Sequence, residues 1–235
     1  MAQLFCEKVY VENAERKMPV IKSTIRKSEY EEIYRLLDTV SPLPFDCGIL
    51  CGAACCGTDD EAWAGHPVFE DDGAALQGRD AGEDIPEMGI YLLPGEEKVH
   101  SKKDGWLTWS EERAEDYEFP DSWKGKVYFV RCKTPPHCPR EKRPIQCRTF
   151  PLSPHYMEDG RLVMILNDLE LPYQCPLIEE EMDLDPVFLK VTWSCWARLV
   201  EDPLIRDLVR MDSEGRNGYA DGMIVVYDPE DTMES

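Results

Sequence analysis

Four cysteines fall within ten residues in the stretch CGILCGAACC, residues 47–56, and this clustering constrains the chain more than any other feature. Cys47, Cys51 and Cys55 are spaced four apart. On a helix this spacing would place three thiols on one face, whereas in a loop the interspersed glycines would let the backbone wrap around an ion. Both arrangements suit the binding of a soft metal by thiolates. Cys56 follows Cys55 directly and points in another direction, so one ion would not use both.

A second group of cysteines lies downstream, in irregular segments that contain several prolines. Its members are Cys132, Cys138, Cys147 and Cys175. Arg143 and Arg148 bracket Cys147, where their charge would offset the negative charge of gathered thiolates. The two groups match either two four-thiolate sites or one cluster with spare thiols, and core packing or disulfides explain them less well. The other two cysteines, Cys6 and Cys195, fit burial in the core.

Composition favours metal ligation over disulfides. A chain of 235 residues with 43% hydrophobic residues can bury a core without covalent links. It has no run of about 18 apolar residues and no secretory pattern at its N-terminus, so we expect no membrane span and a cytoplasmic location. Cytosolic thiols stay reduced. The net charge of -21 repels phosphate backbones and anionic lipid, so we expect neither nucleic acid nor membrane as a partner, and a protein partner or protein substrate stays open.

The apolar pattern predicts one compact, loop-rich α+β domain over residues 1–235, with a cysteine-rich core at about 45–176 and a small sheet. A helix over residues 28–40 is indicated by apolar residues at helical spacing. Ser28 and Glu31 form the sequence pattern of a capping box at its start. We expect this helix to pack on the core.

The C-terminal part, at about residues 185–212, is predicted to be helical and to pack on the same core. Asp185 followed by Pro186 is a typical helix start, and Pro203 opens a second amphipathic segment.

Short apolar runs between these helical parts predict strands. They cover residues 89–93, 127–131 and 162–166. Residues 94–120 are predicted to form a short helix and turns. Residues 57–88 are rich in glycine and acids and lack periodicity, which is typical of a long solvated loop.

Three segments together resemble a known family. CGILCGAACC, the apolar run IYLLP and RPIQCRTFP are similar to the CxxCxxCC (YkgJ-like) family of zinc- or iron-chelating proteins, over about residues 45–155. Cys51, Cys55 and Cys56 correspond to the leading cysteines of that family. The RPxxCRxFP segment is the most specific part, and it is present here as Arg143, Pro144, Cys147, Arg148, Phe150 and Pro151. The resemblance implies an iron–sulfur cluster or zinc, and a flagellin lysine methylase carries a related cysteine arrangement.

We therefore expect a metal held by some or all of eight cysteines: Cys47, Cys51, Cys55, Cys56, Cys132, Cys138, Cys147 and Cys175. Three hypotheses follow. The first is a cytoplasmic metal-binding protein with an iron–sulfur cluster or zinc, the second a cluster-dependent enzyme resembling the lysine methylase, and the third a structural zinc module for protein–protein interaction. Glycine-rich nucleotide motifs and hydrolase motifs are absent from the sequence, so no catalytic residue and no further cofactor site is predicted.

The histidines are weaker candidates for metal ligands than the cysteines. His137, beside Cys138, and His155 are candidate ligands that we expect in loops. The other two histidines and a pair of acids are expected at the surface: His66, His100, Glu96 and Glu97.

Overall fold

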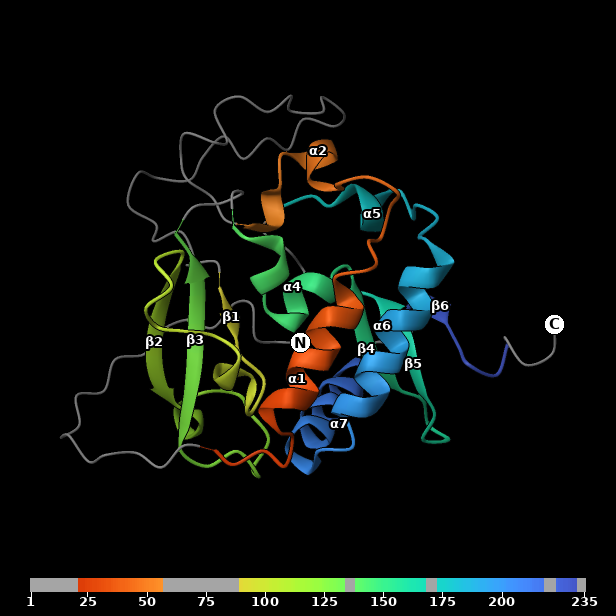
Figure 1. The fold of residues 1–235 in the computed structure, drawn as a ribbon. Helices are drawn as coiled ribbons and strands as arrows, with labels where there is room; N and C mark the ends of the chain where they lie inside the picture. Colours follow the sequence, from red (N-terminus) through yellow and green to blue (C-terminus); the bar gives the residue numbers. More distant parts are fainter. Residues whose placement is uncertain (1–20, 57–88, 134–137, 168–172, 218–222, 232–235) are drawn as a thin grey trace, which may run out of the picture.

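The computed structural model describes residues 21–56, 89–133, 138–167, 173–217 and 223–231, and these residues form helices and two small antiparallel sheets. The α+β class predicted from the sequence is confirmed. Figure 1 shows the two sheets on either side of helix α1, with α6 and α7 beside it and the short helices α2 and α5 together at one end. Within these residues, no helix has both the length and the apolar character needed to cross a membrane.

The first sheet has the strand order β1-β3-β2. Strands β1 (Ile90–Tyr91) and β3 (Lys126–Cys132) confirm two of the predicted runs, and they pair antiparallel. Strand β2 (Leu107–Arg113) corrects the prediction of a short helix and turns for this stretch, because it pairs with β3 along its whole length. Leu107 and Trp109 of β2 pack with Val130 of β3 in a small second cluster on one face of this sheet, and the short 3₁₀ turns η3 (Glu96–Lys98) and η4 (Ala114–Asp116) lie before and after β2.

The second sheet has the order β4-β5-β6. Strand β5 (Leu162–Leu166) is the third predicted run, and it pairs antiparallel with β4 (Leu152–Tyr156) and β6 (Val225–Tyr227). Strand β4 was not predicted, because it contains Pro154. Proline has no N–H to donate and is tolerated here since β4 lies at the edge of the sheet.

Helix α1 (Lys27–Leu37) begins one residue earlier and ends three residues earlier than the predicted helix 28–40. The predicted capping box is also wrong. Glu29, not Glu31, reaches back to the start of the helix, where its Oε2 atom accepts a hydrogen bond from the Arg26 amide at 2.8 Å. The buried face of α1 carries Tyr30, Ile33, Tyr34 and Leu37.

The two predicted C-terminal helices are present as α6 (Pro186–Leu199) and α7 (Pro203–Asn217). Asp185 caps α6 by accepting a hydrogen bond from the Val187 amide at 2.7 Å. Proline in the first turn costs no hydrogen bond, because that amide has no partner within the helix.

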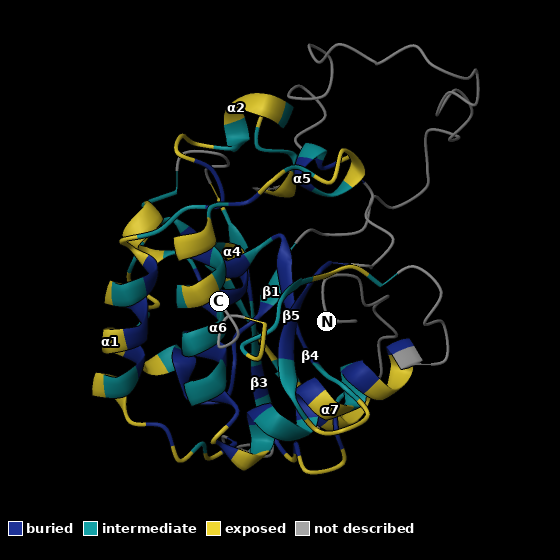
Figure 2. Cartoon of the chain, turned by 90° about the vertical axis from the view of Figure 1, so that its right-hand side faces the viewer, coloured by how far each residue is buried: buried dark blue, intermediate teal, exposed yellow. Residues whose placement is uncertain are grey.

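One buried cluster joins the two sheets to helices α1, α6 and α7. It contains Tyr91 and Val127 of the first sheet, Leu152 and Met164 of the second, and Cys195, which is fully buried as predicted. Figure 2 shows this buried centre and, in contrast, the exposed surface of α2 and α5.

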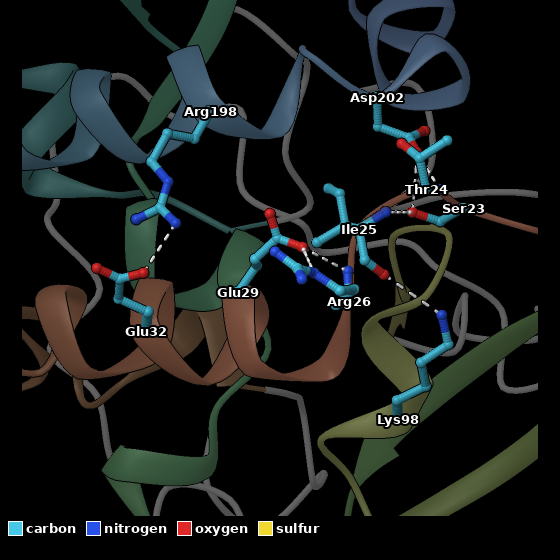
Figure 3. Close-up of polar contacts among 9 residues, drawn as sticks. All are labelled: Ser23, Thr24, Ile25, Arg26, Glu29, Glu32, Lys98, Arg198 and Asp202. Atoms are coloured by element: carbon cyan, nitrogen blue, oxygen red, sulfur yellow. Dashed lines mark hydrogen bonds and ion pairs between the residues drawn. The ribbon is translucent and has the colours of Figure 1, made fainter.

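Residues just before α1 are fastened to the start of α7 (Figure 3). The Asp202 Oδ2 atom accepts hydrogen bonds from the Ser23 hydroxyl at 2.9 Å and from the Thr24 amide at 2.6 Å. Its Oδ1 atom accepts from the Leu204 and Ile205 amides in the first turn of α7. One buried carboxylate thus joins two chain segments 179 positions apart.

Candidate metal centre

The leading cysteines lie on two short helical turns. Helix α2 (Gly48–Cys51) follows Cys47, and the 3₁₀ turn η2 is formed by Ala54–Cys56. Gly52 and Ala53 between them have left-handed backbone angles, with φ of 61° and 59°. The chain therefore reverses after Cys51, and the four-residue spacing does not stack three thiols on one continuous helix.

Two further cysteines lie on short helices at the same end of the molecule. Cys147 is on α4 (Ile145–Thr149), and Cys175 is the residue before α5 (Pro176–Glu179). In both views α5 lies next to α2, and α4 lies between them and the rest of the fold (Figures 1 and 2).

Cysteines from separate segments act electrostatically on the buried phenol of Tyr173. Burial raises the pKa of Tyr173, and four thiols raise it further through their negative charge: Cys55, Cys175, Cys147 and Cys51. We use "thiol cluster" for these four residues together with Cys47.

Cys47 belongs to this cluster because it acts on Cys175. Burial, followed by the charges of Cys51 and Cys47, raises the pKa of Cys175 to about 11, although the amides of its own helix oppose the shift. The pKa of Cys47 is likewise raised by burial, then by Asp46 and Cys51. The thiolate forms of Cys47 and Cys175 are therefore disfavoured, chiefly by burial and to a smaller extent by neighbouring cysteines, and a bound cation would relieve both effects.

Arginines bring positive charge to the same region. The Arg143 Nε atom donates a hydrogen bond to the Cys138 sulfur at 2.9 Å, and Arg140 and Arg143 both lower the pKa of Cys47 against the stronger effects that raise it. Arg143 therefore links Cys138 to the thiol cluster.

The described side chains do not form a complete ligand set. Within the described part of the chain, no group of three or more His, Cys, Asp or Glu side chains could hold a metal ion as arranged. Cys132 ends strand β3 opposite Leu107, and the side chain of Cys56 lies outside the described residues. The donor chemistry fits a soft metal, since thiols of graded exposure gather beside guanidinium groups, and metal binding would draw these thiols closer together.

Arg148, next to Cys147, is held rigidly beneath the cluster. Its guanidinium carbon lies 4.4 Å from the centre of the Tyr34 ring, and its Nε atom donates to the Arg143 carbonyl at 2.6 Å. It also forms an ion pair with Asp38 at the end of α1. The specific RPxxCRxFP segment thus folds back on itself and packs on α1.

Glu96 and His100 are buried, which corrects the expectation that both lie at the surface. The side chain of Glu96 is fully buried and that of His100 is 2% exposed. The Tyr34 hydroxyl donates its proton to Glu96 Oε1 at 2.6 Å, so His100 Nε2, which lies 2.7 Å from the same hydroxyl, donates to the Tyr34 oxygen. His100 Nε2 itself lies 4.0 Å from Glu96 Oε1, so the three side chains form one buried polar group.

Glu96 also fixes the start of α4. Its Oε1 atom accepts a hydrogen bond from the Ile145 amide at 2.8 Å, and its Oε2 atom accepts one from the Leu93 amide at 2.9 Å. Burial on its own raises the pKa of Glu96, but His100, Tyr34 and the Ile145 amide outweigh burial and hold the pKa below its ordinary value. A buried carboxylate thus positions the helix that carries Cys147.

The histidine predictions have mixed outcomes. His155 lies in strand β4 and is 1% exposed, so the prediction of a loop is wrong for it. His137, His66, Cys6 and the predicted loop 57–88 lie outside the described residues.

The sequence matches no family model, and neither the curated proteins nor the solved structures gave a match.

Sequence reasoning missed Tyr173, Tyr34 and Glu96. Tyr173 lies two residues before Cys175, and that proximity is a local signal that could have drawn attention to it. Glu96 carries no such signal, because its partner Ile145 is 49 positions away and only the fold brings the two together.

Proposed function

We propose that this protein binds a metal through its clustered cysteines, as an iron–sulfur cluster or as zinc, in the reducing environment of the cytoplasm. The supporting observation is that thiols from η2, α2, α4 and the residue before α5 all act on one buried phenol, Tyr173. Eight cysteines are described, and none of these is in a disulfide.

Electrostatics supports the same proposal. Burial and the charges of Cys51 and Cys47 raise the pKa of Cys175, so its thiolate is unfavourable unless a cation is present, and a metal ion would supply that charge. The guanidinium of Arg143, bonded to the Cys138 sulfur, would compensate the residual negative charge of a thiolate site. A bound cluster would supply electron transfer or an open coordination position, whereas zinc would supply structural stability.

The test is anaerobic purification followed by metal and sulfide analysis and an absorption spectrum. We expect stoichiometric iron with sulfide and a brown colour, or else colourless protein with stoichiometric zinc. Metal-free folded protein whose thiols all react freely would refute the proposal.

Substitutions separate ligation from misfolding. Replacing Cys51, Cys55, Cys138 or Cys147 by Ser should each lower metal affinity by about tenfold or more, comparable to or larger than the loss of a supporting residue. The matched control is Cys195→Ala, since Cys195 is a fully buried cysteine of the core and no part of the cluster. Equal metal loss in this control would show that the losses follow instability.

A further inference from the structure

A groove of about 480 Å³ opens between the end of α1, the segment 39–45 and the start of α6. Its apolar lining comes from Val40, Leu43, Pro44, Phe45 and Val187. The wall is fixed by the backbone, because the Asp185 amide donates a hydrogen bond to the Pro42 carbonyl at 2.9 Å. The groove is thus part of the ordered fold.

Exposed apolar side chains concentrate at this groove and beside it. Val187 is 60% exposed and Phe45 is 45% exposed. Helix α2, which begins three residues after Phe45, adds Ile49, which is 76% exposed, and Leu50. These are four of the six large hydrophobic residues found exposed in the described part of the chain. Single exposed apolar residues are ordinary, but a group of them around a groove marks a contact surface.

The surroundings of the groove are acidic. Asp185 and Asp38, the latter paired with Arg148, line it, and exposed Asp46 follows Phe45 directly. The segment that leads to Asp185 adds further exposed acids: Glu179, Glu180, Glu181 and Asp183. Against these, Arg140 is a lining residue of positive charge, and its guanidinium donates to the Val40 carbonyl.

Charge decides which occupant fits this surface. A second copy of this chain carries the same net charge of -21 and would be repelled. Anionic lipid and nucleic acid are repelled for the same reason. An apolar side chain flanked by lysine or arginine matches both the lining and the rim.

We propose that this groove docks a cationic segment of a partner protein, with one apolar side chain inserted between Phe45 and Val187 and basic residues against the acidic rim. The docked segment would lie next to the thiol cluster, because Cys47 follows Phe45 by two residues. The proposal does not depend on bound metal, since every contact that it uses belongs to the chain itself.

The test uses a panel of fluorescein-labelled ten-residue peptides and the full chain, with binding measured by fluorescence anisotropy. Each peptide carries Leu, Ile, Phe, Trp or Tyr at its centre and two lysines on either side. We expect at least one to bind with Kd below about 1 mM, to weaken as salt is added, and to weaken about tenfold or more in the double variant Phe45→Ser, Val187→Ser. Both side chains are exposed, so the variant should fold, and its thermal unfolding is compared with that of the parent.

Matched controls make the result specific. The double variant Ile224→Ser, Val225→Ser removes exposed apolar residues beside and within β6 and should leave peptide affinity unchanged. Peptides with glutamate in place of lysine, and peptides with serine at the centre, should not bind. The proposal is overturned if no cationic peptide binds below about 1 mM, if the serine-centred peptides bind equally well, or if the groove variant binds as tightly as its parent. It is also overturned if sedimentation shows a dimer of this chain that the groove variant loses.

Discussion

Glu96 shows how one buried carboxylate positions the helix that carries Cys147. Its carboxylate is fully buried, and it receives hydrogen bonds from Tyr34, Leu93 and Ile145. These contacts join α1, the turn after β1 and the start of α4. Removing the charge leaves three donors facing an imperfect acceptor, and a buried donor without a partner costs about 1–3 kcal/mol.

We therefore predict that Glu96→Gln lowers the free energy of unfolding by about 1–3 kcal/mol, measured by urea denaturation. The exposed carboxylate in Glu111→Gln serves as control and should cost about 0–1 kcal/mol. The folded-state pKa of Glu96 is lowered, so its contribution is present above the ordinary value of 4.5 and is lost as pH falls through the folded-state value. The parent should therefore lose its advantage over Glu96→Gln on acidification, and an advantage that grows toward acid pH would contradict this account.

At the scale of elements, Asp202 has two roles: it caps a helix, and it forms hydrogen bonds with Ser23 and Thr24, which we call the tether. It caps α7 and also binds the segment before α1 (Figure 3). Although burial opposes the charged form, hydrogen bonds from Thr24, Ser23 and Ile205 hold the pKa of Asp202 below its ordinary value.

The predicted consequence is that Asp202→Ala costs more stability than the loss of an ordinary cap. We expect about 2–4 kcal/mol for Asp202→Ala, because both the cap and the tether are lost. The matched control is Asp185→Ala, which removes the cap of α6 alone and should cost about 0.5–2 kcal/mol. Equal costs in urea denaturation would mean that the tether to Ser23 and Thr24 contributes nothing.

Elements with local signals could be predicted from the sequence. A starting proline and apolar residues at helical spacing predict helices α6 and α7. Short apolar runs predict strands β1, β3 and β5. Strand β2 could not be predicted, because its charged half, with Glu111 and Glu112, is held by pairing with β3 and carries little apolar signal of its own. The reversal at Gly52 and Ala53 depends on left-handed angles, which alanine rarely adopts.

The metal ligands predicted from cysteine spacing stay a prediction, and the arrangement of these cysteines could not be predicted from the sequence. Cysteine spacing identified thiols that the fold brings near Tyr173. Their meeting depends on the packing of α4 and α5 at one end of the molecule, which is a long-range result of the whole core. Buried polar contacts such as Tyr34 with Glu96, 62 positions apart, have no local signature.

At the scale of the whole molecule, the thiol cluster lies partly in the main core and partly outside it. Cys175 and Tyr173 belong to the core that joins both sheets with α1, α6 and α7, whereas the described side chains of α2 and η2 are exposed or half-buried. Binding free energy from a metal should therefore stabilise α2 and η2 more than the core.

We predict that removing the metal from the purified protein speeds amide hydrogen exchange in residues 47–56 and leaves α6 and α7 protected. The described side chains of this segment are exposed or half-buried, so its local stability is low without the metal. The measurement is hydrogen exchange by mass spectrometry before and after chelation. Unchanged exchange in residues 47–56 would mean that the metal does not fasten the cluster, and equal acceleration in α6 would mean that it supports the whole fold.

The contacts between α1 and residues far away in the sequence also have a consequence for biosynthesis. Glu32 of α1 pairs with Arg198 of α6, 166 positions later in the sequence. The separation between Ser23 and its partner Asp202 is larger, at 179 positions. A ribosome adding about 5–20 residues per second takes roughly ten to thirty seconds over that distance. During this interval α1 lacks α6, although the shorter α4, which also packs on α1, is made earlier, and the first cysteines are made well before Cys175. The packing of α1 on α6 therefore waits until the last third of this sequence has been made, and any metal site that used Cys175 would be completed only then.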